Sequence, residues 1–171
     1  MNPIVKYVLQ FIVLILLQVL VVDQISLGYA SQFIIPSVYF LFVLMLPLNV
    51  SSGLLMFLAF FIGMMVDVFK STPGMHASAM VFLGYSRPYL LKLIEPREGF
   101  DILKSPSIYS MRKSIYLVYL SLASLVFHLW YFTVEVMRFS DFHVILVKTL
   151  FSSIISVLLI ILMQYLTVKR K

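Results

Sequence analysis

The stretch IVKYVLQFIVLILLQVLVV, residues 4–22, decides the fold class of this chain. Apart from Lys6, Tyr7, Gln10 and Gln18, every residue in it is aliphatic or phenylalanine. A helix of about 20 apolar residues is long enough to cross the hydrocarbon core of a bilayer. The run lacks a small-x-small cleavage site, and further apolar runs follow it, so it does not resemble a signal peptide. We predict that it is retained as a membrane-spanning helix.

The composition of the whole chain also indicates that its surroundings are lipid. Hydrophobic residues make up 62% of the 171 residues and charged residues only 12%, and the mean hydropathy is +1.05. Soluble domains are about a quarter charged, so this chain has too little charge to cover its surface in water. The net charge of +6 comes from basic residues spread over loops and tails, which indicates membrane topology and no nucleic-acid partner. The absence of cysteine excludes disulfides, thiolate metal sites and a cysteine nucleophile.

Six apolar runs predict an all-α membrane protein with six transmembrane helices and a single integral membrane domain, residues 1–171. Turn-forming residues, among them Pro73 and Gly74, separate the runs. The predicted spans are residues 4–22, 33–48, 53–69, 77–93, 115–136 and 144–168.

Lysine and arginine predict the orientation of these spans. With the N-terminus inside, only three of the 13 basic residues fall on the outer side, Lys70, Arg138 and Lys148. This bias follows the positive-inside rule and puts both termini in the cytoplasm. The loop of residues 92–114 is then cytoplasmic. Its mixed charges fit a contact with anionic lipid headgroups or a cytoplasmic protein, and equally a plain solvated connector.

Charged groups at membrane depth are costly and are therefore candidates for function. Asp67 ends the third predicted span, just before Lys70 and the turn at Pro73. It is either a carboxylate that binds a ligand or partner at the outer interface, or a structural carboxylate that bonds loop amides or pairs with Lys70. We favour the structural alternative. His76, just beyond the turn, is interpreted as an interfacial histidine.

A second polar group lies on the fifth and sixth predicted spans. His128, Phe132 and Glu135 share one helical face, since residues three, four and seven apart align. We predict that Glu135 pairs with Lys148, because either charge alone in lipid would be expensive; Arg138 is a competing partner. The cluster either binds a ligand or partner or holds the helices together, and we favour the second.

Small residues on two spans predict close helix packing. Ala59 and Gly63 form a small-xxx-small pair on the third span, and Ser152, Ser153 and Ser156 form a similar face on the sixth. This pattern does not separate contacts inside the bundle from contacts with a partner helix. We find no catalytic constellation, metal-ligand spacing or phosphate-binding glycine loop. We therefore expect a protein that is not an enzyme and needs no cofactor or metal.

The stretch GMMVDVFKSTPGMHASA, residues 63–79, resembles the signature of the MreD family of rod shape-determining proteins. In that family a glycine-x-x-x-aspartate motif ends one span, a short turn with glycine follows, and small residues open the next span. Gly63, Asp67 and Gly74 match these positions, and Arg87 matches an arginine-proline pair that closes the fourth span. The run REGF, residues 97–100, and the stripe from His128 to Glu135 resemble the Bacteroidota version. The resemblance extends over nearly the whole chain. Lys70 departs from the pattern, which has a small or polar residue there.

The resemblance implies a non-catalytic scaffold in the bacterial inner membrane, within the elongasome that guides peptidoglycan synthesis and maintains rod shape. Its direct partner would be the single-span MreC, and through it MreB, RodA and the transpeptidase that works with RodA. The implied fold is similar to the substrate-binding subunit of energy-coupling-factor transporters. In this resemblance Gly63 would permit close packing and Gly74 would permit the turn. Asp67 would fix the outer end of the span, and Arg87 would lie near the cytoplasmic face.

One alternative function shares the size and the number of spans. The chain could be a vitamin-binding membrane subunit of an energy-coupling-factor transporter. Such a subunit needs a polar pocket that opens outward, which Asp67, His76 and Glu135 could line. A tightly bound vitamin in the purified protein would favour this alternative over the scaffold.

Overall fold

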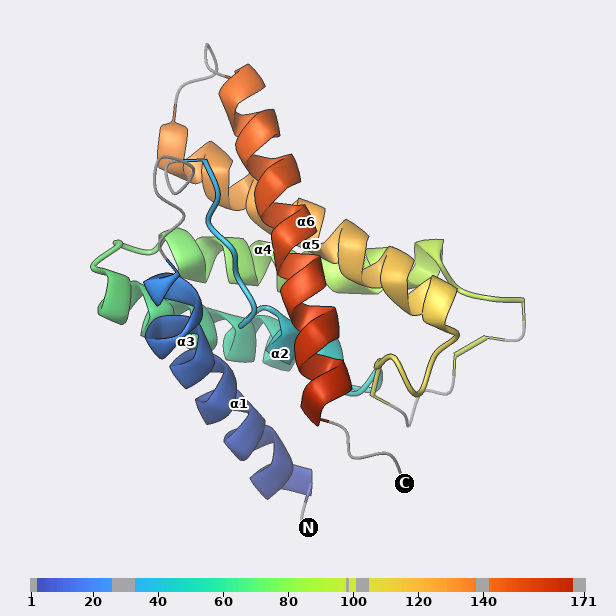
Figure 1. The fold of residues 1–171 in the computed structure, drawn as a ribbon. Coiled ribbons are helices and arrows are strands. Elements are labelled where there is room, and N and C mark those ends of the chain that lie inside the picture. The colour runs from blue at the N-terminus through green and yellow to red at the C-terminus, as the bar shows by residue number, and fades with distance from the viewer. Residues whose placement is uncertain (1–2, 26–32, 98, 101–104, 138–141, 168–171) are drawn as a thin grey trace.

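The computed structural model describes residues 3–25, 33–97, 99–100, 105–137 and 142–167, and all regular secondary structure in these ranges is helical. This confirms the all-α fold class (Figure 1). The five long helices are α1 (Pro3–Leu20), α3 (Ser52–Lys70), α4 (Met75–Leu93), α5 (Lys113–Val136) and α6 (Phe142–Thr167). Two short elements, the 3-10 helix η1 (Val22–Gln24) and the one-turn helix α2 (Leu41–Met45), lie between α1 and α3.

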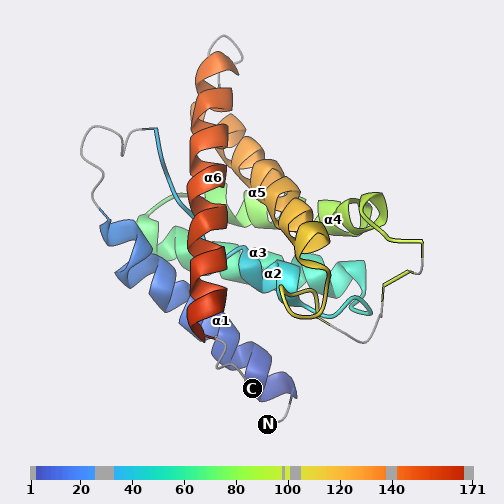
Figure 2. The ribbon, with the colours of Figure 1, turned by 45° about the vertical axis from the view of Figure 1, so that its right-hand side comes forward.

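The long helices pack in chain order around a central non-helical segment. Helix α3 packs against α4, α4 against α5, and α5 against α6, while α1 packs against α3 and η1. In Figures 1 and 2 the segment before α2 runs beside α6 towards the middle of the bundle, and the start of α1 and the end of α6 lie at the same end of the molecule. The core is therefore built by every long helix around residues 33–45.

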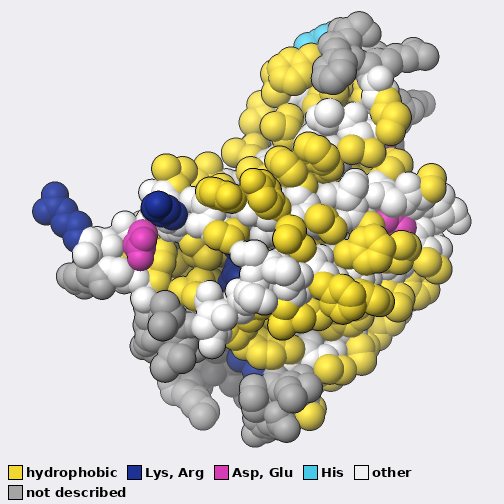
Figure 3. Space-filling view, turned by 180° about the vertical axis from the view of Figure 1, so that it is seen from behind, with side chains coloured by type: hydrophobic (Ala, Val, Ile, Leu, Met, Phe, Trp, Pro, Cys, Tyr) yellow, Lys and Arg dark blue, Asp and Glu magenta, His cyan; other side chains and the backbone are white. Residues whose placement is uncertain are grey.

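Four helical stretches of the described chain are long and apolar enough to cross a membrane: Val5–Gln24, Ser52–Lys70, Lys113–Val136 and Phe142–Leu166. Their outward faces are apolar as well. On α6 an exposed stripe repeats every fourth residue, formed by Leu146, Leu150, Ile154, Leu158 and Leu162. A helix at a protein–water boundary would carry polar residues there. Figure 3 shows a face covered largely by hydrophobic side chains, with Lys and Arg mainly at one edge. This surface suits lipid.

The predicted fourth span is also a long helix, α4, although it carries Arg87 and Lys92 and is not among those four. The prediction of a spanning helix over residues 33–48 is wrong, because only Leu41–Met45 is helical there. Pro36 and Pro47 explain the difference. Proline lacks an N–H and drives the residue before it out of the α-helical region, and Leu46, just before Pro47, is extended, with φ −63° and ψ 148°.

Helix α6 supplies hydrogen bonds that this non-helical backbone cannot make for itself. The Ile35 N–H donates to Ser152 Oγ at 3.0 Å, and the Ser37 N–H donates to Ser156 Oγ at 2.8 Å. An unpaired N–H in an apolar interior costs several kcal/mol, on the order of 2–7 kcal/mol, so irregular backbone persists at such depth only where protein groups bond it. The small face of α6 therefore serves a contact inside the bundle.

Helix α1 supplies a second set of bonds through Gln18, which is fully buried. Its Oε1 accepts the Val38 N–H at 2.8 Å, and its Nε2 donates to the Pro36 carbonyl at 3.1 Å and to Asp23 at 2.8 Å. The Gln18 side chain amide thus supplies a donor and an acceptor that a helix would have supplied from its own backbone. The residues that follow, 38–44, are almost completely buried.

Replacing Ser156 with alanine should leave the Ser37 N–H buried without a partner. We expect a loss of about 1–3 kcal/mol in the free energy of unfolding, measured by thermal unfolding of the purified protein in detergent. Ser121→Ala is the matched control, because Ser121 is a half-buried serine on α5 whose hydroxyl makes no hydrogen bond among the described residues. Equal stability of the two variants would contradict the assigned role of Ser156.

Candidate functional site

Asp67 caps the start of the helix that follows its own. Helix α4 begins after Gly74, which occupies the N-cap position with φ +78° and has no side chain with which to cap it. The Asp67 carboxylate, near the end of α3, accepts the His76 N–H at 3.0 Å and the Ala77 N–H at 2.8 Å. It also accepts the Thr72 hydroxyl at 2.7 Å. The first N–H groups of a helix lack intrahelical partners and favour negative charge.

This geometry matches the structural alternative for Asp67, in which the carboxylate bonds backbone amides. The proposed pairing with Lys70 is wrong. Both Asp67 oxygens are directed to the start of α4, and Lys70 instead forms an ion pair with Asp23 at 2.9 Å. Asp23 lies on η1, so the Lys70–Asp23 pair ties the end of α3 to the end of α1.

Gly63 provides the close approach between α3 and α4. A Cβ at this position would lie 2.5 Å from the Ala77 Cα and 2.7 Å from the His76 carbonyl oxygen, distances that real Cβ atoms do not reach. At Ala59, one turn earlier on α3, the packing is less tight: a Cβ added at Gly84 of α4 would lie 3.4 Å from the Ala59 Cβ, an ordinary contact distance. The small-xxx-small pair therefore packs inside the bundle. It also sets Asp67 within reach of the α4 amides.

Arg87 is buried, with 2% of its surface exposed, and fastens the end of α2. Its guanidinium donates to the carbonyls of Leu44 and Pro47 at 3.4 and 3.5 Å and to that of Leu46. Its Nε donates to the Tyr119 hydroxyl on α5 at 3.1 Å. The resemblance implies a position near the cytoplasmic face; the side chain itself faces the interior and bonds carbonyls where the chain leaves α2, since the last carbonyls of a helix lack intrahelical partners.

His128 continues the bonding network of the central segment into α5. A carbonyl only accepts, so Nδ1 carries the proton and donates to the Ser124 carbonyl at 2.8 Å. Nε2 then accepts from the Ser156 hydroxyl at 3.3 Å, whose oxygen accepts the Ser37 N–H. The Phe132 ring stacks on the imidazole at 6.2 Å between centroids. His128 thus joins α5, α6 and the segment, as the packing interpretation predicts.

The predicted ion pair between Glu135 and Lys148 is confirmed. Lys148 Nζ lies 2.9 Å from Glu135 Oε2 and 5.4 Å from the centre of the Phe132 ring. Both side chains are partly exposed. The pair joins the end of α5 to the beginning of α6. Arg138, the competing partner, lies outside the described residues.

The interpretation of His76 as an interfacial histidine is wrong, because its side chain is fully buried. Nδ1 lies 2.6 Å from the Tyr39 hydroxyl, and the Tyr131 ring lies against the imidazole at 4.7 Å between centroids. Sequence reasoning missed Tyr39 and Tyr119 as buried polar partners. The sequence signal for them is a tyrosine hydroxyl inside an apolar run. Tyrosines at the membrane interface give the same signal, so the sequence does not distinguish the two positions.

Asp67 and Arg87 each bond main-chain groups of a neighbouring element. His128 bonds a carbonyl of its own helix and the Ser156 hydroxyl of α6, and these contacts together fix helices and connections in place. Over the described ranges, no three His, Cys, Asp or Glu side chains come together as a metal site.

No protein-family model, no curated protein and no solved structure matches this chain.

The close contact at Gly63 predicts a large difference between two glycines of the same helix. Gly63→Ala should lower the free energy of unfolding by about 1–3 kcal/mol, because Ala77 backbone must move. Gly53→Ala on α3 meets nothing within 4 Å and should be neutral or stabilising by up to about 1 kcal/mol. Denaturation midpoints of both variants in detergent measure this. Equal effects would contradict the tight helix crossing.

The capping role of Asp67 predicts sensitivity to loss of its charge alone. Asp67→Asn keeps the size of the side chain but turns one acceptor into an NH₂ donor that faces an N–H. We expect a loss of about 1.5–3 kcal/mol in the free energy of unfolding.

Asp23→Asn is the control for this prediction. The Asp23–Lys70 pair is partly exposed and such pairs contribute about 1 kcal/mol or less, while the remaining Oδ1 of an asparagine still accepts the Gln18 amide. The same thermal unfolding assay compares the two variants. The assigned role of Asp67 would be refuted by an Asp67→Asn protein as stable as the Asp23→Asn protein.

Proposed function

We propose that this chain is a non-catalytic scaffold of the bacterial cell-wall elongation machinery and a member of the MreD family. It would lie in the inner membrane, bind the single-span MreC, and through it join MreB to RodA and its transpeptidase. The observation that carries the proposal is the run from Gly63 to Pro88, whose family positions fall on the contacts on which this fold depends.

The roles of those positions support a scaffold. Gly63 and Gly74 permit the α3–α4 corner, Asp67 caps it, and Arg87 fastens α2. A family signature made of fold-forming residues suits a protein that works through its outer surface and carries no reaction. The exposed apolar faces of α1, α3 and α6 offer that surface to lipid and to a partner helix.

The proposed topology keeps six crossings with both termini in the cytoplasm. Five crossings would be the long helices, and the second would be the broken segment around residues 33–48. Its buried backbone, bonded by Gln18, Ser156 and Arg87, supports a crossing without a continuous helix, since non-helical backbone at membrane depth needs protein partners.

The test is affinity purification of an epitope-tagged chromosomal copy from native membranes, followed by identification of the proteins that accompany it. We expect MreC to be recovered and to be absent from an untagged strain. Depletion of the chain should turn rod-shaped cells round. Normal rods together with no recovery of MreC would refute the proposal.

The same preparation distinguishes the scaffold from the alternative function, a vitamin-binding subunit of a transporter. A vitamin-binding subunit would carry a stoichiometric vitamin, detectable by mass spectrometry of the denatured protein, and would purify with the coupling subunit of a transporter. We expect neither. Recovery of both, without MreC, would favour the transporter subunit over the scaffold.

A further inference from the structure

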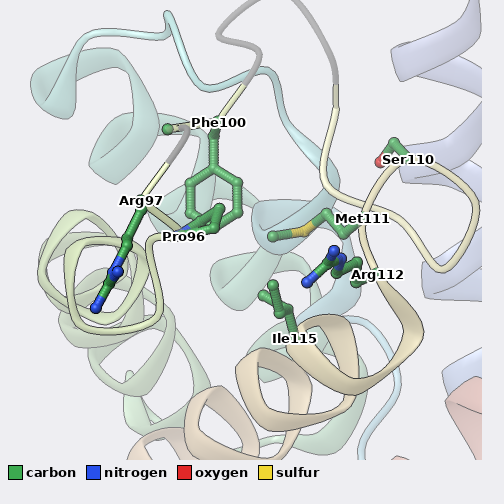
Figure 4. Close-up of a pocket in the computed structure, with 8 residues that line it drawn as sticks. Pro96, Arg97, Phe100, Ser110, Met111, Arg112 and Ile115 are labelled. Carbon is green, nitrogen blue, oxygen red and sulfur yellow. The ribbon is translucent and has the colours of Figure 1, made fainter.

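A cavity of about 450 Å³ opens where α4 ends and α5 begins, at the end of the bundle rich in basic residues. Its lining residues come from the two stretches that flank the connection, and they include Arg97, Phe100, Ser110, Met111, Arg112 and Ile115. Figure 4 shows Phe100, Met111 and Ile115 facing a common space, with the Arg112 guanidinium beside Met111 and Ile115 and Arg97 extended outward at the rim.

The cavity combines apolar walls with two exposed guanidinium groups, those of Arg97 and Arg112. Within the described part of the chain neither guanidinium takes part in an ion pair or hydrogen bond. An arginine fork matches the oxygens of a phosphate. The walls formed by Phe100, Met111 and Ile115 would in turn exclude water from an apolar portion of the same ligand.

The surroundings favour a ligand with a tail that continues along the bundle. Exposed apolar side chains lie within about one turn of a lining residue on both helices, namely Leu93 on α4 and Leu117 and Val118 on α5, and Tyr89 lies about one turn further along α4. A ligand whose anionic group met Arg112 would therefore have apolar surface directly beside it. Free phosphate has no apolar portion to pack against these walls, and an acidic peptide has too little apolar surface to cover the exposed apolar turns.

We propose that this cavity binds the phosphate headgroup of an anionic phospholipid, with Arg112 as the principal cation and Arg97 as a second one at the rim. The proposal rests on the membrane location proposed above and does not depend on the scaffold role or on MreC. Bound lipid would hold the ends of α4 and α5 at headgroup depth, because Arg112 directly precedes α5.

The experiment is native mass spectrometry of the full chain in detergent, with added phosphatidylglycerol or phosphatidylcholine of identical acyl chains. We expect retained phosphatidylglycerol to exceed phosphatidylcholine. Arg112→Gln should lower that preference about fivefold, the effect of about one basic residue at an anionic surface, and Arg97→Gln should lower it less. Phe100→Ala should reduce retention of the lipid without a change of charge.

Lys92→Gln is the matched control, because Lys92 is exposed at the same end of the bundle but does not line the cavity. It should leave the preference unchanged, and an equal loss with Lys92→Gln would mean a diffuse basic surface and overturn the proposal. Inorganic phosphate in excess should not displace the lipid. Its displacement by phosphate would assign the cavity to a free anion, and the absence of any headgroup preference would also overturn the proposal.

Discussion

The structure depends on one constraint, which is that non-helical backbone inside an apolar bundle must find all its hydrogen bonds in the protein. Residues 33–47 impose this constraint at the centre of the fold. Three long helices meet it with side chains, Gln18 from α1, Arg87 from α4, and Ser152 and Ser156 from α6, and His128 extends the network to α5. These buried polar residues attach the helices to one segment and help to determine how the helices pack around it.

The corner between α3 and α4 makes this arrangement possible. Gly63 lets the two helices approach closely, and Asp67 caps α4 in place of the missing side chain at Gly74. With the start of α4 fixed in this way, Arg87 on the same helix reaches the carbonyls at the end of α2. Gly63, Asp67, Gly74 and Arg87 therefore support one another through the fold. A protein organised in this manner has a well-defined interior and a large apolar exterior, which suits a surrounding of lipid.

Hydropathy predicted α1, α3, α5 and α6 because each is a long, largely apolar run, and the cost of an isolated charge in lipid predicted the Glu135–Lys148 pair. The same reasoning failed over residues 33–48, since a buried extended segment is as apolar as a helix; Pro36 and Pro47 carried the signal of the break. The partner of Lys70 was misassigned for a related reason. Asp67 is its neighbour along the chain, whereas Asp23 becomes its neighbour only when α1 packs beside α3.

Amide hydrogen–deuterium exchange of residues 37–44, followed by mass spectrometry on the purified protein, tests the central claim most directly. These residues lie in or beside a helix of a single turn, so local secondary structure alone would give them little protection. If side chains from α1, α4 and α6 bond and bury this segment, its amides will exchange as slowly as those of α3. Exchange within seconds, as in an unstructured peptide, would contradict the account.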